Sequence, residues 1–141
     1  MDNDHAVFVF DWQKNDKPII REKGDSQKIL DIICRPDDPL SFCTVGVKHI
    51  KFWKMTLAGG KAILGQKKGL FGTKGTIQAV LCGAFMSDGT FVSGCINGEI
   101  YIWTNKNEIG NIIQSGHKVG DRHPFSPSFL EWKENKCHKV K

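Results

Sequence analysis

Long apolar runs are missing from this sequence, and so is any segment that resembles a signal peptide. The longest apolar stretches have the length of a single strand, far below the roughly 18 consecutive apolar residues of a membrane-spanning helix. The first five residues are polar and partly acidic, without the basic start and apolar core of a secretory signal. We therefore expect a cytoplasmic chain that does not associate with membranes.

Paired cysteines are also absent. The chain has five cysteines, an odd number, and contains no Cys-x-x-Cys pair. The histidines and the cysteine near the C-terminal end do not have the spacing of a zinc site, so we expect no bound metal. The other four cysteines lie in strand patterns and are expected to be buried, reduced thiols in a reducing compartment. These are Cys34, Cys43, Cys82 and Cys95.

No set of residues suggests catalysis or cofactor binding. The sequence has no Ser/His/Asp arrangement and no cluster of metal-ligating residues. Asp37 and Asp38 form a carboxylate pair, but prolines flank them, and we expect both side chains to be exposed in a turn. The Gly- and Lys-rich stretch 67–76 does not match the phosphate-binding pattern Gly-x-x-x-x-Gly-Lys-[Ser/Thr], so we expect a solvated loop. The sequence therefore predicts a protein that is not an enzyme, with no catalytic residues and no cofactor.

Charge is nearly balanced over most of the chain. The net charge is +5, but residues 1–117 hold 14 Lys and Arg against 12 Asp and Glu, whereas residues 118–141 hold 6 against 3. A nearly neutral main segment argues against a nucleic-acid-binding surface, so nucleic acid is not an expected partner. Residues 118–141 show no strand alternation and are expected to form a disordered basic tail. Two interpretations of this tail remain open: a basic peptide for an acidic partner, or an end without a function.

The most informative segment that is present, 88–103, predicts two strands joined by a tight turn. Asn97-Gly98 is a strong hairpin signal, because both residues tolerate the positive φ of a type I′ turn. The residues on both sides are mostly β-branched or aromatic and suit a half-buried sheet. A similar pattern of turn, strand and strand runs from 36 to 53, and an incomplete copy opens the chain at 6–12.

Three tryptophans align these copies. Trp12 and Trp53 are 41 positions apart, and Trp53 and Trp103 are 50 positions apart. A repeat of about 40 residues, with two strands that end in Trp, is typical of a WD40 propeller blade. We therefore predict an all-β fold: a partial WD40 β-propeller with two full four-stranded blades, half a blade and an extended C-terminal tail. The incomplete repeat region is residues 1–117, and the tail is residues 118–141.

The expected strands follow from apolar runs and turn residues. The half blade has strands at 6–12 and 17–21, the first full blade at 28–35, 41–46, 49–54 and 61–65, and the second at 77–85, 91–93, 100–103 and 111–114. The innermost strand of each full blade is almost continuously apolar, as expected for strands covered on both faces. Closed propellers have typically 4–8 blades, so this chain cannot close a ring. We expect it to be marginally stable alone, to self-associate through its open blade edges, or to need the rest of a ring.

WD40 blades usually contain a stabilising network made of a His before the inner strand, a Ser or Thr, an Asp in the middle turn, and the Trp. The pattern here is incomplete, and we expect about 1 kcal/mol less stability for each missing hydrogen bond. The first full blade places Asp25, Thr44, Lys48 and Trp53 at these positions. The second places Ser93, Asn97 and Trp103 there and has no His before Ile77.

Three segments are more particular than the general repeat. They are 7–12 (Val-Phe-Val-Phe-Asp-Trp), 42–53 (Phe-Cys-Thr-Val-Gly-Val-Lys-His-Ile-Lys-Phe-Trp) and 67–72 (Lys-Lys-Gly-Leu-Phe-Gly). With these segments the chain resembles the echinoderm microtubule-associated protein-like family, as a fragment or truncated isoform, over about residues 6–117. That family combines tandem WD40-type propellers with a motif called HELP, and we find no HELP-like segment or heptad run in this sequence. The resemblance implies a microtubule-binding role on the cytoskeleton for the parent protein.

The resemblance leads to a first functional hypothesis, a cytoskeletal interaction module that binds microtubules or tubulin. Lysines would meet the acidic surface of tubulin through an attraction that salt screens. As possible tubulin-facing residues we select Lys48, Lys51, Lys67, Lys68 and Lys74. Two alternatives are a general WD40 scaffold that binds other proteins through its propeller faces, and an incomplete fragment without a function.

Overall fold

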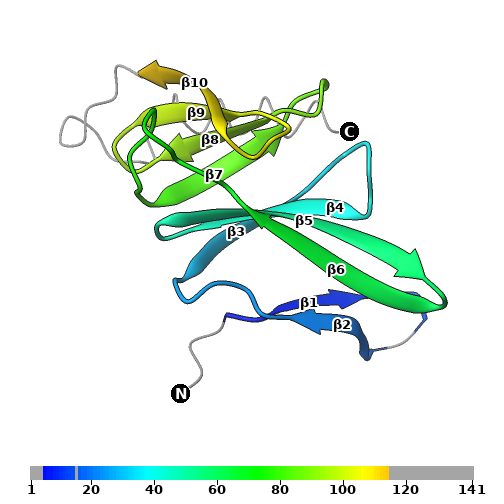
Figure 1. Ribbon diagram of the computed structural model, residues 1–141. Coiled ribbons are helices and arrows are strands. Elements are labelled where there is room, and N and C mark those ends of the chain that lie inside the picture. Colours follow the sequence, from blue (N-terminus) through cyan, green and yellow to red (C-terminus); the bar gives the residue numbers. More distant parts are fainter. Residues whose placement is uncertain (1–4, 15, 115–141) are drawn as a thin grey trace.

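The computed structural model of the chain describes residues 5–14 and 16–114, and all regular secondary structure in this part is β-strand (Figure 1). The predicted tail, residues 118–141, lies outside the described residues. Ten strands form three antiparallel sheets that do not close into a ring. The strands are β1 (Val7–Phe10), β2 (Pro18–Glu22), β3 (Ile29–Cys34), β4 (Ser41–Gly46), β5 (His49–Ala58), β6 (Lys61–Lys68), β7 (Val80–Phe85), β8 (Phe91–Cys95), β9 (Glu99–Trp103) and β10 (Ile109–Gln114).

Each sheet joins strands that are consecutive in the sequence. One sheet contains β1 and β2, and the two four-stranded sheets have the orders β3-β4-β5-β6 and β7-β8-β9-β10. The turns that connect neighbouring strands use residues with positive φ, including Lys48 (60°) and Gly98 (88°). The chain turns at Asn97-Gly98 as predicted, but Asn97 does not have a positive φ, so the expected type I′ turn is wrong. This meander topology confirms the all-β prediction of two four-stranded blades and half a blade.

The main hydrophobic core lies between the two four-stranded sheets. Cys43, Val45 and Ile50 of the first sheet pack against Phe91, Tyr101 and Trp103 of the second, with Phe52 half-buried beside them. The ring of Phe52 contacts Phe91 and Trp103 edge-on, at centroid distances of 5.7 and 6.2 Å. Alternation along β4 and β5 explains this packing, because every second side chain points toward the second sheet.

A smaller core lies on the opposite face of the first four-stranded sheet. There Trp53 and Leu64 pack against Val7 of β1, with Val9 and Ile20 of the two-stranded sheet half-buried around them. In both cores, therefore, the sheet that carries the buried Trp presents it to the sheet that precedes it in the sequence.

The same buried hydrogen bond occurs in both four-stranded sheets. The indole Nε1–H of Trp53 donates to Oγ1 of Thr44 at 2.9 Å, and that of Trp103 donates to Oγ of Ser93 at 2.9 Å. In each case the hydroxyl comes from the adjacent strand and is fully buried. These two bonds confirm the Trp and Ser/Thr positions expected from the repeat.

The alignment of Trp12 with the two buried tryptophans is wrong. In the β1–β2 ladder, Phe10 pairs with Pro18, and the neighbouring pair leaves out one residue of β2. The β9–β10 ladder has the same irregularity, because Trp103 pairs with Ile109 and the neighbouring pair leaves out one residue of β10. Phe10 is thus the counterpart of Trp103. Trp12 lies two positions later, in the turn after β1, and its side chain is 84% exposed.

Some expected boundaries and burial states also differ from the structure. The inner strand of the second blade begins at Val80, because Ile77 belongs to the connection after β6 and is 64% exposed. Strand β6 continues to Lys68, so Lys67 and Lys68 pair with β5 and are not part of a loop. Three of the four cysteines are buried as expected, but Cys34 is exposed at the end of β3.

We predict that the buried indole bond stabilises the first four-stranded sheet. Thr44→Val keeps the shape of the side chain but removes the acceptor, which leaves the Trp53 N–H buried without its partner and should cost about 1–3 kcal/mol. Thr56→Val is the control, because Thr56 is exposed on β5, and its free energy of unfolding should change by less than about 0.5 kcal/mol. Urea unfolding of the full chain measures both, and equal losses would contradict the assigned role.

Candidate interaction surface

A buried polar cluster lies where β4 and β5 meet the connection from β2. Nδ1 of His49 lies 2.9 Å from the carbonyl oxygen of Val47 and 3.6 Å from a carboxylate oxygen of Asp25. Nζ of Lys51 contacts the carbonyl oxygen of Gly24 and lies 3.6 Å from Asp25. Asp25 and His49 are both less than 10% exposed, so this cluster ties the connection to the sheet.

The pKa of Asp25 is lowered by this environment. Burial acts against the charged form, but the backbone N–H of Gln27, at 3.0 Å, and the nearby side chains of His49, Lys51 and Lys68 favour it and have the larger combined effect. Asp25 therefore serves as an internal anionic partner for the lysines of β5 and β6.

The second four-stranded sheet has a different cluster at the equivalent place. The ladder pairs Thr44 with Lys51 in the first sheet and Ser93 with Tyr101 in the second, so Tyr101 replaces Lys51. The Tyr101 hydroxyl donates to Glu99 at 2.6 Å and accepts from the amide of Gln78 at 2.8 Å. In this sheet, the neutral side chain of Tyr101 holds the connection before β7 by hydrogen bonds, whereas in the first sheet the charged Lys51 holds the connection before β3.

The expected stabilising network is therefore only partly correct. Asp25, Thr44 and Trp53 take part, but Lys48 is an exposed turn residue, and His49 is the side chain that faces Asp25. The His and the Asp have exchanged places relative to the usual pattern. Sequence reasoning missed Gln78 as well, because it lies within the predicted strand 77–85, whereas β7 begins only at Val80 and Gln78 belongs to the connection before it.

The five selected lysines do not gather on one surface. Lys51 is turned inward to Asp25, and Lys68 pairs opposite it in the β5–β6 ladder. Lys48 is exposed in the turn between β4 and β5. Lys67 lines a groove between the two four-stranded sheets, and Nζ of Lys74 lies 3.4 Å from the carbonyl oxygen of Gly110. Lys48, Lys67, Lys68 and Lys74 are exposed, whereas Lys51 is only partly accessible.

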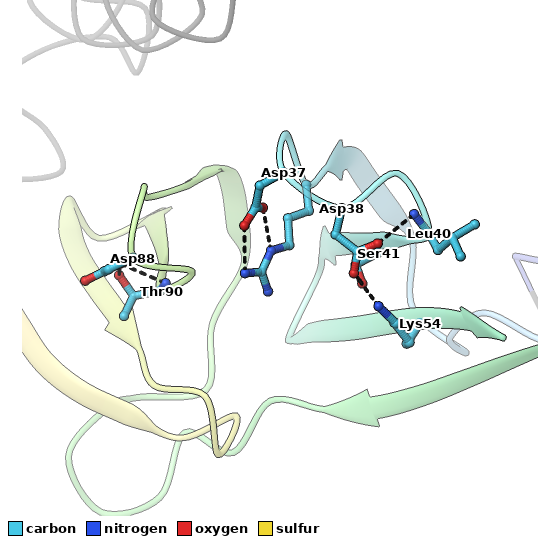
Figure 2. A network of polar contacts seen from close by, with 8 residues as sticks. Asp37, Asp38, Leu40, Ser41, Lys54, Asp88 and Thr90 are labelled. Atoms are coloured by element: carbon cyan, nitrogen blue, oxygen red, sulfur yellow. Dashed lines mark hydrogen bonds and ion pairs between the residues drawn. The ribbon is translucent and has the colours of Figure 1, made fainter.

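Exposed ion pairs lie in the loop between β3 and β4, beside the β7–β8 turn (Figure 2). Arg35 forms a bidentate pair with Asp37, at 2.7 and 3.1 Å, and its guanidinium lies 6.0 Å from the ring centre of Phe85. Asp38 contacts Nζ of Lys54 and accepts from the Ser41 hydroxyl at 2.7 Å. As predicted, the two aspartates lie in a turn, but both are held in ion pairs.

The lysine beside Asp38 has a strong electrostatic effect. The hydrogen bond from Lys54, together with those from the Ser41 hydroxyl and the Leu40 N–H, lowers the pKa of Asp38 from 3.8 to about 2. In the neighbouring turn, hydrogen bonds from Thr90 lower the pKa of Asp88 (Figure 2). These carboxylates therefore stay charged and fix their loops at any ordinary pH.

A groove of about 340 Å³ opens between the two four-stranded sheets. Its aromatic walls come from β4, β5, β7 and β8, and its polar lining comes from the β3–β4 loop, β4, β5, β6 and the β9–β10 turn. The principal lining residues are Arg35, Phe52, Lys54, Lys67, Phe85 and Asn107. Within the described residues, no three His, Cys, Asp or Glu side chains are grouped so as to hold a metal ion. The described part of the chain also has no helix long and apolar enough to cross a membrane.

We predict that the ion pair of Asp38 makes stability depend on acidity. Because the folded-state pKa lies below the ordinary value, the charged carboxylate stabilises the fold above about pH 4, and this contribution is lost as the pH falls toward 2. Asp38→Asn removes the titrating group, so its free energy of unfolding should fall less than that of the wild type over the same range. Urea unfolding between about pH 5 and pH 2 tests this, and a constant difference between the two proteins would contradict it.

Comparison with known proteins finds relatives but no matching family model. The chain is 34% identical over 119 residues to echinoderm microtubule-associated protein-like 2 of Mus musculus. The matched region is 84% of this chain and 18% of that protein. It is 33% identical over 119 residues to echinoderm microtubule-associated protein-like 1 of Homo sapiens, covering 84% of this chain and 14% of the relative. A third relative, echinoderm microtubule-associated protein-like 4 of Xenopus tropicalis, is 33% identical over 117 residues, covering 83% of this chain and 12% of the relative.

The chain thus spans less than a fifth of the length of these relatives. Within that span the similarity includes most of the described sheets, and three different members match at nearly the same identity. The residues that carried the resemblance at the sequence level lie in β1 and the turn after it, in β4 and β5 with their connecting turn, and at the end of β6 and the start of the connection that follows. On this basis the chain belongs to the echinoderm microtubule-associated protein-like family.

Proposed function

We propose that the chain is a non-enzymatic interaction module that associates with microtubules in the cytoplasm. The observation that carries this proposal is the similarity over 84% of the chain to proteins named as microtubule-associated. The blade architecture supports it, since propeller sheets serve many binding functions through their loops and faces. The named relatives are associated with a cytoskeletal polymer, which supports binding in place of covalent chemistry.

Exposed lysines give this module a means of meeting an acidic polymer surface. Lys48 and Lys74 lie on loops outside the cores, and Lys67 and Lys68 lie on the outer strand β6. Lys51 is the weakest member of the selected set, because it is occupied by Asp25 and the Gly24 carbonyl. Contacts through exposed lysines gain energy mainly from attraction that mobile ions screen, so salt should weaken them.

Co-sedimentation of the full chain with microtubules tests the proposed function. We expect the chain to pellet with microtubules at low salt and to be released as the salt concentration rises toward about 0.5 M, where the screening length falls well below 10 Å. A double variant, Lys48→Glu and Lys74→Glu, should pellet less than the wild type. Tubes without microtubules measure self-aggregation. Pelleting that is equal with and without microtubules, or that occurs only without them, would contradict the proposal.

The tail requires a separate control, because it holds more than half of the excess positive charge. A full-length variant in which Lys133, Lys136, Lys139 and Lys141 are changed to Gln keeps the sheets intact and removes much of the tail's positive charge. If the sheets carry the binding, this variant should pellet like the wild type. Loss of binding in this variant alone would assign the interaction to the basic tail and overturn the proposal for the blades.

A second candidate function, a scaffold that packs against other sheets, is favoured by one open face. Phe8 and Phe10 are 48% and 50% exposed on β1, and their rings stack at 6.4 Å. By register, Phe10 has the position at which Trp103 is covered by the preceding sheet, and no described sheet precedes β1. We propose that a second copy of the chain covers this face, because the fold already packs such faces against the outer face of another sheet.

Sedimentation velocity tests this self-association. The sedimentation coefficient of the wild type should rise with protein concentration, and Phe10→Glu should abolish the rise by placing a charge on the apolar face. Leu57→Glu is the matched control, since Leu57 is also apolar and 69% exposed but lies near the β5–β6 turn. A wild-type coefficient that does not change with concentration would refute self-association, and an equal loss in both variants would refute the assigned face.

A further inference from the structure

The groove between the two four-stranded sheets has a cationic lining without a compensating carboxylate among its walls. Its charged lining residues are Arg35, Lys54 and Lys67, and no Asp or Glu is among the residues that line it. Asp37 and Asp38 neutralise Arg35 and Lys54 from outside the groove, through exposed contacts. Lys67 has no ion-pair partner among the described residues, so the lining keeps a net positive charge.

Neutral donors and aromatic rings complete the lining. The side-chain amides of Asn105 and Asn107 supply N–H groups without adding charge, whereas Nε2 of Gln66 already donates to the carbonyl oxygen of Lys23 at 3.4 Å. Phe52, Phe85 and Phe91 form an aromatic cluster along the wall, with Phe85 and Phe91 in edge contact at 4.9 Å. A ligand that fits this lining therefore carries carboxylates for the cations and amides, and an apolar group for the rings.

The shape restricts the ligand further. A volume of about 340 Å³ is near the lower limit of ordinary ligand pockets, which suits a short stretch of chain better than a folded domain. Beside the groove, the connection after β6 is held to the β9–β10 turn by the bond from the Leu70 N–H to the Asn107 carbonyl at 2.8 Å. We therefore take a short extended peptide as the occupant that fits this groove.

We propose that the groove between the two four-stranded sheets binds a short acidic peptide with a central aromatic residue. Carboxylates of the peptide pair with Lys67 first, and then compete with Asp38 for Lys54. The aromatic side chain lies against Phe52 and Phe85. This site differs from the exposed lysines of the proposed microtubule contact, with which it shares only Lys67, and it does not depend on that function.

Fluorescence anisotropy of a labelled peptide tests the site in the full chain. The probe is a seven-residue peptide in which glutamates flank one phenylalanine, and the comparison peptide has glutamine in place of every glutamate. We expect saturable binding of the acidic peptide only, weakened by salt. Lys67→Glu should weaken binding about tenfold, because it replaces an attraction by a repulsion at the groove wall.

Lys61→Glu is the matched control. Lys61 lies on the same strand β6 and is exposed, but it does not line the groove, so the variant makes the same change in net charge at a different place. Its affinity for the peptide should stay within about twofold of the wild type. Asp38→Asn should bind more tightly than the wild type, because it frees Lys54 while an amide oxygen can still accept from Ser41.

The measured affinities distinguish binding in the groove from nonspecific electrostatic attraction between the peptide and the protein. A selective loss in Lys67→Glu, together with a gain in Asp38→Asn, supports the groove. Equal weakening in Lys61→Glu and Lys67→Glu, equal binding of the two peptides, or absence of saturable binding would overturn it. Thermal unfolding of each variant confirms that it is folded, and Lys67→Met provides a second variant that keeps the apolar stem of the side chain while removing its charge.

Discussion

Each four-stranded sheet of this protein depends on a neighbour to cover the face that carries its buried tryptophan. The indoles of Trp53 and Trp103 each give their N–H to a hydroxyl one strand away, and their rings fill the space between two sheets. A ring of this size buried on one side only would leave a large apolar surface in water. The order of sheets along the chain is therefore also the order of their packing, and both cores follow from it.

Much of the fold could be predicted from the sequence, because turn chemistry and strand alternation are local. The hairpin turn at Asn97-Gly98 and the Trp-hydroxyl pairs are examples, although only Gly98 adopts the positive φ expected of both turn residues. The misplacement of Trp12 has a physical cause: β1 ends at Phe10 and the chain then turns, so Trp12 lies beyond the strand that would have buried it. Phe10 was overlooked because a Trp stood nearby.

The candidate sites were less predictable, because charged side chains choose their partners in space. Lys51 and Lys67 look alike in the sequence, yet one is drawn inward by Asp25 and the other faces the groove. The exchange between Asp25 and His49 shows the same limit, since a polar cluster can satisfy its hydrogen bonds with its members in either order. Cys34 is exposed although its pattern resembles that of the buried cysteines, because it ends its strand.

The distribution of the cysteines has a consequence for observing this protein in solution. Cys34 is exposed, whereas Cys43, Cys82 and Cys95 are buried in three strands of the two large sheets. Burial raises the pKa of Cys95 to about 12 and that of Cys43 well above its usual value, so these thiols are almost never ionised in the folded chain. Since thiolates are the reactive form, a thiol reagent should modify Cys34 at once and the buried three only when their strands separate. The rate at which a reagent modifies the buried thiols therefore reports how often each large sheet opens.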